Sequence, residues 1–409
     1  MKSYVVFSVV LTLLASTGGA IAQPAGSEGD RLFAAADFAG AERAYRAVLR
    51  EDERNGPAEL GLARLAVYRN DLADAERRLD ALDRDDPANA RAKRLRQAVA
   101  ERRADSPDYV ASLAGGEVDV PFDRVDPLPE LTVRVNGTSA HVLLDTGGEG
   151  LDLSAAFARR LGITTEAAGQ GVFAGGLRGT VRTAHVDRLD LAGAAIRSLP
   201  VSVPGELPPG IDGVIGTRVL YQFLATIDYP HGRLVLRPKA ASAAFEAAAT
   251  QRRAAIVPML LVPDHFLFAR ARIGSAPEAL FNIDTGGGGI GVQATKAQLD
   301  AAAIVPDAAH ARPFRGGGGE ARTLPFAADV TLGDQTFAHV PGVYFPDGDQ
   351  YGIFPFAVGG TLSHELFRRG TLTFDFSAMQ LVFETASAPV NRPSTRLARC
   401  TSPQRSRQT

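Results

Sequence analysis

The sequence LLDTGG at 143–148 returns as NIDTGG at 282–287, far along the same chain. A single Asp-Thr-Gly is a common surface turn. Here each copy directly follows apolar residues, so each aspartate stands at the end of a candidate strand. The repetition of one acidic loop in one setting predicts a chain that contains two related halves.

The segments around the two loops support a duplication because they match in the same order. Each copy has a strand pair joined at a glycine, the acidic loop, a Gly-rich hairpin candidate that opens with an aromatic residue, and an apolar-Gly-Thr segment before a short helix and a final hairpin. The hairpin candidates are FAGGLRG at 173–179 and FRGGGGE at 314–320, and the closing segments begin with GVIGT at 213–217 and AVGGT at 357–361. Residues 128–238 and 256–384 are therefore predicted to be two copies of one β-rich unit.

These paired motifs resemble those of the retropepsin-like aspartyl proteases, in the bilobal single-chain arrangement shared with pepsin. The resemblance covers about 128–384 and includes an apolar-apolar-Gly element downstream of each loop. We assign these elements to Val214-Ile215-Gly216 and Ala357-Val358-Gly359, which follow their aspartates at closely similar spacing. The resemblance implies an all-β fold of two pseudo-twofold related barrel lobes, with Gly216 and Gly359 packing against the acidic loops.

The chemistry of peptide hydrolysis explains why the loop is needed twice. A water held between two carboxyl groups is activated when one is ionised and the other protonated, and one carboxyl group cannot be both. We therefore predict Asp145 and Asp284 as the catalytic dyad, without a metal or an organic cofactor. Gly147 and Gly286 permit tight loops, and the resemblance implies that Thr146 and Thr285 lock the loops together.

The Gly-rich hairpins resemble the flaps that close over an extended substrate in this family. The candidate flap residues are Phe173, Gly175, Gly176, Phe314, Gly316 and Gly317. Neither hairpin carries the tyrosine of pepsin-like flaps. A second departure is Gly148 and Gly287, where many family members have Ser, Thr or Ala, and we expect this to affect the rate and the pKa of the dyad.

The N-terminal part of the sequence has a different pattern, which repeats at a fixed period. DFAGAERA at 37–44 reappears as DLADAERR at 71–78, and the shift between them equals the period of tetratricopeptide repeats. Residues 26–102 therefore resemble roughly two such repeats, although a generic pair of helical hairpins would give a similar pattern. Residues 103–127 are predicted to be a linker, and residues 386–409 a disordered tail.

Residues 1–22 have the features of a secretory signal peptide: Lys2, an apolar run and a small-residue site at Ala20-Ile21-Ala22. We expect an exported, bacterial protein that is periplasmic or secreted, with no stable membrane insertion. The lone Cys400 rules out an internal disulfide and a cysteine-based zinc site, and a net charge of −2 gives no field that would attract nucleic acid.

Alternative chemistries lack their motifs, because there is no GxSxG, and His364-Glu365 has no second histidine at zinc-protease spacing. Asp228 and Asp375 follow the short helices and are predicted to be structural. The expected function is an exported aspartic endopeptidase that acts on peptides or unfolded proteins. The main alternative is a non-catalytic peptide-binding or scaffold protein with the same fold. A third possibility gives the main function to the helical module, which could dock a protein partner or substrate, or occlude the cleft.

Overall fold

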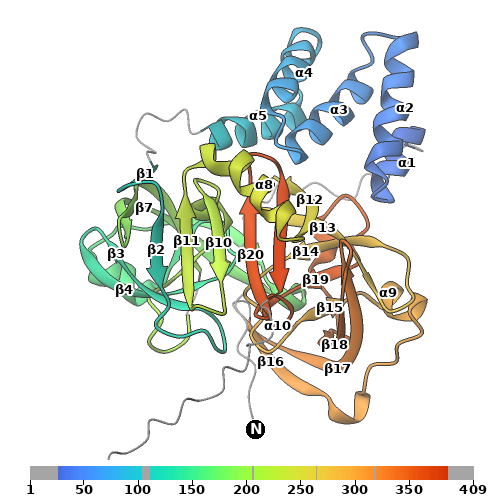
Figure 1. The fold of residues 1–409 in the computed structure, drawn as a ribbon. Helices are drawn as coiled ribbons and strands as arrows, with labels where there is room; N and C mark the ends of the chain where they lie inside the picture. Colours follow the sequence, from blue (N-terminus) through green and yellow to red (C-terminus); the bar gives the residue numbers. More distant parts are fainter. Residues whose placement is uncertain (1–25, 104–110, 205–206, 264, 317–318, 386–409) are drawn as a thin grey trace, which may run out of the picture.

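The computed structural model describes residues 26–103, 111–204, 207–263, 265–316 and 319–385. The predicted signal peptide (1–22) and tail (386–409) lie outside these residues. The described chain forms a helical module above two β lobes (Figure 1). No helix in the described ranges is long and apolar enough to cross a membrane.

The helical module repeats itself as its sequence does. Its helices are α1 (Glu28–Ala34), α2 (Phe38–Glu51), α3 (Gly56–Tyr68), α4 (Leu72–Asp85) and α5 (Ala90–Arg103). Ala36 and Asn70, which occupy the same position in the two repeats, both have positive φ values and form the turns before α2 and α4. The side chains of Asp37 and Asp71 then cap these helices by accepting the amides of Gly40 and Asp74 at 2.8 and 3.0 Å. The predicted period is thus a repeat of turn, cap and helix.

The first lobe (lobe 1) contains one sheet of eight strands in the order β1-β8-β5-β9-β4-β3-β7-β6. Its strands are β1 (Ala111–Leu113), β3 (Glu130–Val135), β4 (Thr138–Leu144), β5 (Leu151–Leu153), β6 (Glu166–Val172), β7 (Arg178–Leu191), β8 (Ala194–Pro204) and β9 (Gly213–Ile215), with the helices α6 (Ala155–Arg160), η1 (Ala174–Gly176) and α7 (Thr217–Leu220). Asn136 and Gly137, both with positive φ, form the turn between β3 and β4, where the sequence predicts one.

The second lobe (lobe 2) repeats this arrangement. Its strands are β12 (Ala255–Val262), β13 (Phe266–Ile273), β14 (Ala279–Ile283), β15 (Val292–Ala294), β16 (Arg312–Gly316), β17 (Gly319–Leu332), β18 (Gln335–Tyr344), β19 (Gly360–Leu362), β20 (Gly370–Asp375) and β21 (Gln380–Thr385), with the helices α9 (Lys296–Ala301), η3 (Ala308–His310), η4 (Tyr351–Ile353) and α10 (His364–Phe367). η2 (Lys239–Ala241) and α8 (Ser242–Gln251) connect the lobes.

A central run of six strands joins the lobes in the order β2-β11-β10-β20-β21-β12, where β2 is Val118–Pro121, β10 is Leu224–Asp228 and β11 is Arg233–Arg237. At its middle, Thr226 of β10 lies directly opposite Thr373 of β20, and their hydroxyl oxygens are 2.8 Å apart. These threonines occupy the same position in the two copies, two residues before Asp228 and Asp375. Their pairing therefore places the pseudo-twofold axis between β10 and β20.

The predicted linker at 103–127 needs a correction, because it contains the strands β1 and β2. β2 pairs with β11 in lobe 1, as β12 pairs with β21 in lobe 2, so β2 is the counterpart of β12 in the first copy. Its pattern is short but regular, with Val118 and Val120 buried and their neighbours exposed. Adjacent charges, Gly and Pro hide this alternation in the sequence.

The helical module is docked on lobe 2 through an aromatic cluster. The ring of Phe356 lies 5.3–6.1 Å from the rings of Phe33, Phe38 and Tyr68, and the backbone amide of Ala357 donates to the carbonyl of Ala34 at 2.8 Å.

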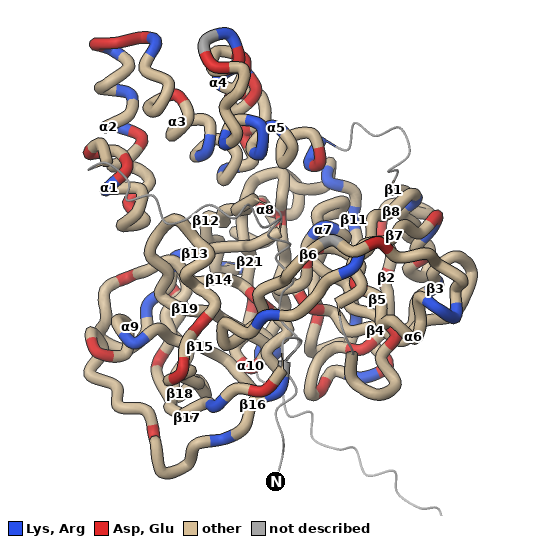
Figure 2. Tube along the Cα trace, turned by 180° about the vertical axis from the view of Figure 1, so that it is seen from behind, with Lys and Arg blue, Asp and Glu red and all other residues tan. Residues whose placement is uncertain are grey.

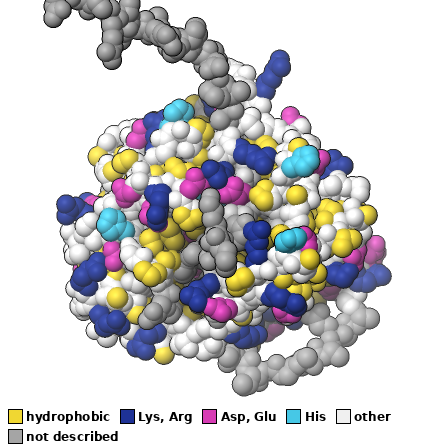
Figure 3. Space-filling model, turned by 90° about the horizontal axis from the view of Figure 1, so that it is seen from below, with side chains coloured by type: hydrophobic (Ala, Val, Ile, Leu, Met, Phe, Trp, Pro, Cys, Tyr) yellow, Lys and Arg dark blue, Asp and Glu magenta, His cyan; other side chains and the backbone are white. Residues whose placement is uncertain are grey.

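The surface elsewhere carries positive and negative side chains interspersed, as the traced chain and the underside of the lobes show (Figures 2 and 3).

Candidate active site

The two acidic loops leave equivalent strands in equivalent ways. Asp145 follows β4, and its backbone amide donates to the carbonyl of Ile215 in β9 at 2.9 Å. Asp284 follows β14, and its amide donates to Leu362 in β19 at 3.0 Å. Both β4–β9 and β14–β19 are parallel pairs, so each loop is fixed by a neighbouring strand that the chain reaches only near the end of the same lobe.

The structure brings the predicted dyad together in a buried space between the lobes. Asp145 and Asp284 are only 1% and 3% exposed. Each carboxylate accepts the amide of its own loop glycine, from Gly147 at 2.7 Å and from Gly286 at 2.9 Å. The two carboxyl groups also share a hydrogen bond with each other.

The loop glycines have a steric role as well. A Cβ atom on Gly147 would lie 2.6 Å from the carboxyl carbon of Asp284, and one on Gly286 would overlap the carboxylate of Asp145. Each glycine therefore makes room for the aspartate of the other loop. Any larger residue at either position would push the two carboxyl groups apart.

Thr146 and Thr285, which the family resemblance implies as the lock, hold the loops to each other. The amide of Thr146 donates to the Thr285 hydroxyl at 3.0 Å, and the amide of Thr285 donates to the Thr146 hydroxyl at 3.1 Å. The Thr146 hydroxyl donates in turn to the carbonyl of Ile283 at 3.0 Å. Both side chains are buried, so water does not compete for these bonds.

Burial raises the pKa of Asp145 well above its usual range, and the neighbouring charge and hydrogen bond of Asp284 raise it further. The amide of Gly147 opposes this shift because it favours the ionised form. Two carboxyl groups so close cannot both ionise easily, so the pair retains one proton as a unit. The arrangement supplies one acid and one base at the same point.

The glycine predicted at 359 does not have the position assigned to it. Gly216 follows β9 beside the Asp145 loop, as predicted. In lobe 2, however, the strand that pairs with β14 is β19, and Ser363 follows it, as Gly216 follows β9. Gly359 lies before β19 and donates its amide to the carbonyl of Leu280. The prediction was wrong because residues 357–359 repeat the apolar-apolar-Gly pattern of residues 214–216 at a different place in the strand order.

Ser363 explains why Gly follows the second Asp-Thr-Gly. Its hydroxyl donates to the backbone carbonyl of Asp284 and accepts the amide of Gly287 at 2.9 Å. A Cβ on Gly287 would clash with the Ser363 side chain, whereas the nearest atom to a Cβ on Gly148 is 3.3 Å away. Lobe 2 has thus moved a hydroxyl from the acidic loop to the end of the neighbouring strand, so Gly287 does not leave this loop without a hydroxyl partner.

The predicted flaps are hairpins, but their aromatic residues are not equivalent. Phe173 borders the tip formed by Gly175 and Gly176, both with positive φ. Phe314 lies inside the other hairpin, paired with Ala321. Gly316 ends β16, and Gly317 lies outside the described residues.

The tip of the lobe-1 flap is held closed by lobe 2. The amide of Gly175 donates to the side-chain oxygen of Gln350 at 3.3 Å, and Ala174 packs in a cluster with Phe314 and Phe345. Gln350 is 7% exposed and forms a reciprocal amide pair with Gln293, at 3.2 and 3.3 Å. The side chains of Phe345 and Gln350 therefore hold the tip of the lobe-1 flap against lobe 2.

Three buried polar residues near the dyad were not predicted from the sequence. Asp152 is 6% exposed, and one of its carboxylate oxygens has no hydrogen-bond partner among the described residues. Burial, and then the charge of Glu149, raise the pKa of Asp152 to about 8. Burial and the charge of Asp145 raise the pKa of Tyr229, and burial and Arg218 lower that of His265 to about 3. For Asp152 the signal was a charge between two leucines in a strand.

Asp228 and Asp375 serve the backbone, as predicted. Asp228 accepts from Arg233 and from the amide of His231, and Asp375 accepts the amides of Ser377 and Ala378 at 2.9 and 3.0 Å. Both close the turns of their hairpins.

Among the residues that the structure describes, one group of side chains has atoms close enough together for a metal ion, namely Asp126, His364 and Glu365. The guanidinium of Arg368 already bonds both carboxylates, at 3.0 and 3.1 Å. This arrangement fits an ion-pair network better than a metal centre.

Comparison with known proteins agrees with this geometry. Residues 131–219 match the family model described as aspartyl protease, and residues 32–99 match tetratricopeptide repeat. No curated protein matches significantly. The chain thus joins tetratricopeptide-like hairpins to a bilobal β fold of the aspartic-protease kind.

Similar solved structures have low identity to the chain. One is a retropepsin-like aspartic protease from Rickettsia conorii, at 16% identity, covering 32% of this chain and 94% of that chain with a TM-score of 0.23. Basic 7S globulin from soybean is 13% identical, covers 68% of this chain and 96% of its own, and has a TM-score of 0.39. Conglutin gamma, a basic 7S globulin from lupine seeds, is 9% identical, covers 66% of this chain and 95% of its own, and has a TM-score of 0.40.

The exchange between Gly287 and Ser363 gives a first prediction. Gly287→Ser alone should destabilise the protein by about 1–3 kcal/mol, because its side chain meets Ser363. Ser363→Gly alone should cost a similar amount, because it removes two buried hydrogen bonds. The double variant should recover at least half of the summed loss, measured by urea unfolding. Strict additivity of the two losses would contradict the proposed exchange.

Asp152 gives a second prediction, on pH. Its folded pKa of about 8 lies above the ordinary 3.8, so between these values the native protein holds a proton that the unfolded chain has released. The free energy of unfolding should therefore fall as pH rises from 4 to 8. The variant Asp152→Asn cannot titrate in this range. Between pH 4 and 8 the free energy of unfolding of the parent should fall by on the order of 2–4 kcal/mol more than that of the variant. Parallel curves for the two proteins over this range would show that Asp152 is ionised throughout.

Proposed function

We propose that the chain is an exported aspartic endopeptidase that hydrolyses peptide bonds with a water activated between Asp145 and Asp284. The observation that carries this proposal is the buried hydrogen bond between the two carboxyl groups, each also held by the amide of its loop glycine. An arrangement that served only packing would not keep two unneutralised carboxyl groups in contact, because their burial is costly.

The reaction follows from the shared proton. The ionised carboxylate takes a proton from water, and the oxygen of that water attacks the carbonyl carbon of the peptide bond. The protonated carboxyl group meanwhile donates to the carbonyl oxygen, and the tetrahedral intermediate then releases an amine and an acid. The substrate lies extended beneath the flaps, and the amide of Gly175, now bonded to Gln350, is released to bind its backbone.

The second candidate is a non-catalytic protein that binds peptides in the same cleft. The observation in its favour is the closed flap, whose tip is packed against Phe345 and bonded to Gln350. Under this alternative the closed state is the resting state of a binding cleft, and the buried dyad contributes hydrogen bonds but no turnover.

Export is proposed from the signal-like residues 1–22, with a periplasmic or secreted location. The test is the mature N-terminus after expression in a bacterial host, which should be Gln23. An intact Met1 on the purified protein would overturn this part of the proposal.

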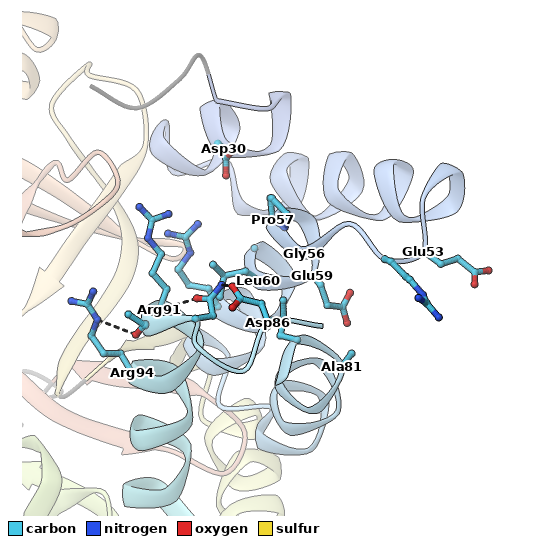
Figure 4. Close-up of a pocket in the computed structure, with 16 residues that line it drawn as sticks. Asp30, Glu53, Gly56, Pro57, Glu59, Leu60, Ala81, Asp86, Arg91 and Arg94 are labelled. Atoms are coloured by element: carbon cyan, nitrogen blue, oxygen red, sulfur yellow. Dashed lines mark hydrogen bonds between the residues drawn. The ribbon is translucent and has the colours of Figure 1, made fainter. Parts of the chain in front are cut away.

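We further propose that the helical module docks a protein partner or substrate segment. A groove of about 670 Å³ opens between its helices, with Arg91 and Arg94 of α5 on one side and Pro57 and Leu60 of α3 on another (Figure 4). Its lining residues are Asp30, Glu53, Arg54, Gly56, Pro57, Glu59, Leu60, Gly61, Arg64, Ala81, Leu82, Asp86, Asn89, Ala90, Arg91 and Arg94.

The charges in this groove favour an acidic segment. Three of its four acidic residues are already engaged: Asp30 with Tyr45, Glu59 with Arg78, and Asp86 with Asn89. Among the described residues, none of its four arginines forms an ion pair with a carboxylate. A ligand that supplies carboxylates would therefore meet guanidinium groups that have no such partner within this part of the chain.

The dyad is tested by cleavage of an unfolded peptide mixture across pH 3 to 8, with products read by mass spectrometry. Asp145→Asn and Asp284→Asn should each lower the rate by about 10²–10⁴-fold, because each removes one half of the acid–base pair. The exposed Asp300→Asn is the matched control and should retain full activity. Peptide binding by the folded parent without any cleavage would favour the non-catalytic alternative.

The groove is tested by the binding of fluorescent peptides that differ only in Glu against Gln. The parent should prefer the Glu series by about tenfold, and the double substitution Arg54→Gln with Arg91→Gln should abolish the preference. A control substitution, Arg315→Gln in the second flap hairpin, should not change it. Equal affinity of the parent for both series would exclude an acidic ligand.

A further inference from the structure

Beside each aspartate of the dyad, three neighbouring strands present one side chain each to the same face of the sheet. In lobe 1 Leu143 and Asp152 both pair with Val214. Residues directly opposite each other in neighbouring strands point to the same face, and residues two apart along a strand do so as well. Since Leu143 stands two positions before Asp145, this group of three, the lobe-1 triad, lies on the side of the dyad.

Lobe 2 has the equivalent group, the lobe-2 triad, which consists of Asn282, Gln293 and Thr361. Asn282 and Gln293 both pair with Thr361, and Asn282 stands two positions before Asp284. The pseudo-twofold axis thus puts two groups of three side chains on opposite sides of one reaction centre. Their chemistry differs at every position.

The lobe-2 triad is already occupied by polar groups of the chain itself. Gln293 forms its amide pair with Gln350, and the hydroxyl of Thr361 is 2.8 Å from that of Tyr351. These contacts satisfy the hydrogen-bonding groups of Gln293 and Thr361 that point away from the sheet.

The lobe-1 triad offers an apolar wall with one carboxyl group. Leu143 and Val214 pack in a cluster with Leu128, and the half-buried side chains of Leu207 and Ile211 lie against this cluster. Asp152 is buried as well, and one of its carboxylate oxygens has no partner within the described ranges. The charged groups that act on Asp152 are acidic: Glu149, and Asp145 of the dyad. Arg218, the nearby cation, forms an ion pair with Glu149 at 2.7 Å.

Burial keeps this carboxyl group protonated in the resting protein, and its ionised form becomes favourable when a ligand supplies a cation beside it. The apolar wall suits the aliphatic part of a long side chain, and the carboxyl group suits a positive charge at its end. Lysine and arginine have both features. Arg218 forms ion pairs with Glu149 and with Glu101 of the helical module.

We propose that Asp152 is a specificity-determining residue, and that the lobe-1 side of the cleft binds a lysine or arginine side chain of the peptide substrate. This inference rests on the proposed peptidase function, of which it specifies the substrate. The lobe-2 side is occupied by Gln350 and Tyr351 and offers no carboxyl group from its triad. The preference for a basic side chain should therefore apply on only one side of the scissile bond.

The test uses peptides in which lysine or norleucine is moved through the positions around the scissile bond. Norleucine keeps the aliphatic stem and lacks the charge. The parent should cleave the lysine peptide with a kcat/KM at least about tenfold higher at one position. Asp152→Asn should reduce this ratio to within about twofold, while Asp300→Asn, which removes an exposed carboxylate, should leave it unchanged.

Equilibrium binding of the same peptides to Asp145→Asn separates this inference from the peptidase proposal. A lysine preference in binding without cleavage by the parent would overturn the peptidase and retain the role of Asp152. Cleavage of both series with equal kcat/KM by the parent would overturn the role of Asp152 and retain the peptidase. This second result needs no variant, so misfolding of Asp152→Asn cannot mask it. Absence of both binding and cleavage would overturn both.

Discussion

The contact between two buried carboxyl groups is the constraint on which the rest of the structure depends. Neither loop can hold its aspartate in this position alone, because the room for each carboxylate is made by a glycine of the other loop. The crossed bonds of Thr146 and Thr285 then fix the loops at that distance. The site is consequently a property of the interface between the halves, and the central strands β10 and β20 keep that interface in register.

The symmetry is strict at the axis and is relaxed away from it. Thr226 lies directly opposite Thr373. The backbone amides of Asp145 and Asp284 donate to carbonyl groups at equivalent positions of their two lobes. One strand further out, Ser363 replaces the glycine at the end of β9, and polar residues replace the apolar wall of lobe 1. Two carboxyl groups must stay within hydrogen-bonding distance of each other to share one proton, whereas an asymmetric peptide chain can be bound by two different walls. The pattern of symmetry therefore follows the division between chemistry and recognition.

The sequence was sufficient for the features that repeat. The two acidic loops, the flap hairpins and the helical period each occur twice, and a second copy separates a signal from chance. It was insufficient where the copies diverge. Gly359 was misplaced because residues 357–359 repeat the apolar-apolar-Gly pattern of residues 214–216. Only the pairing of β14 with β19 reveals Ser363 at the position equivalent to Gly216.

Other features depend on contacts that local pattern does not encode. β2 was assigned to a linker because so short an alternation beside Gly and Pro is too little to predict a strand. Asp152 lies in a Leu-Asp-Leu sequence that is typical of a half-exposed strand, yet tertiary packing buries its side chain. The closed flap is equally out of reach, since Gln350 lies 175 residues from Gly175 in the chain.

The segment from Phe345 to Ala357 links the two parts that the sequence presents as separate. Its first half packs on the flap tip and bonds the amide of Gly175, while its second half places Phe356 among the aromatic rings of the helical module. The flap and the helical module therefore contact the two ends of one short segment of lobe 2. The short η4 helix lies between these two contacts, so the contact with the helical module and the contact with the flap are separated by only a few residues of the chain.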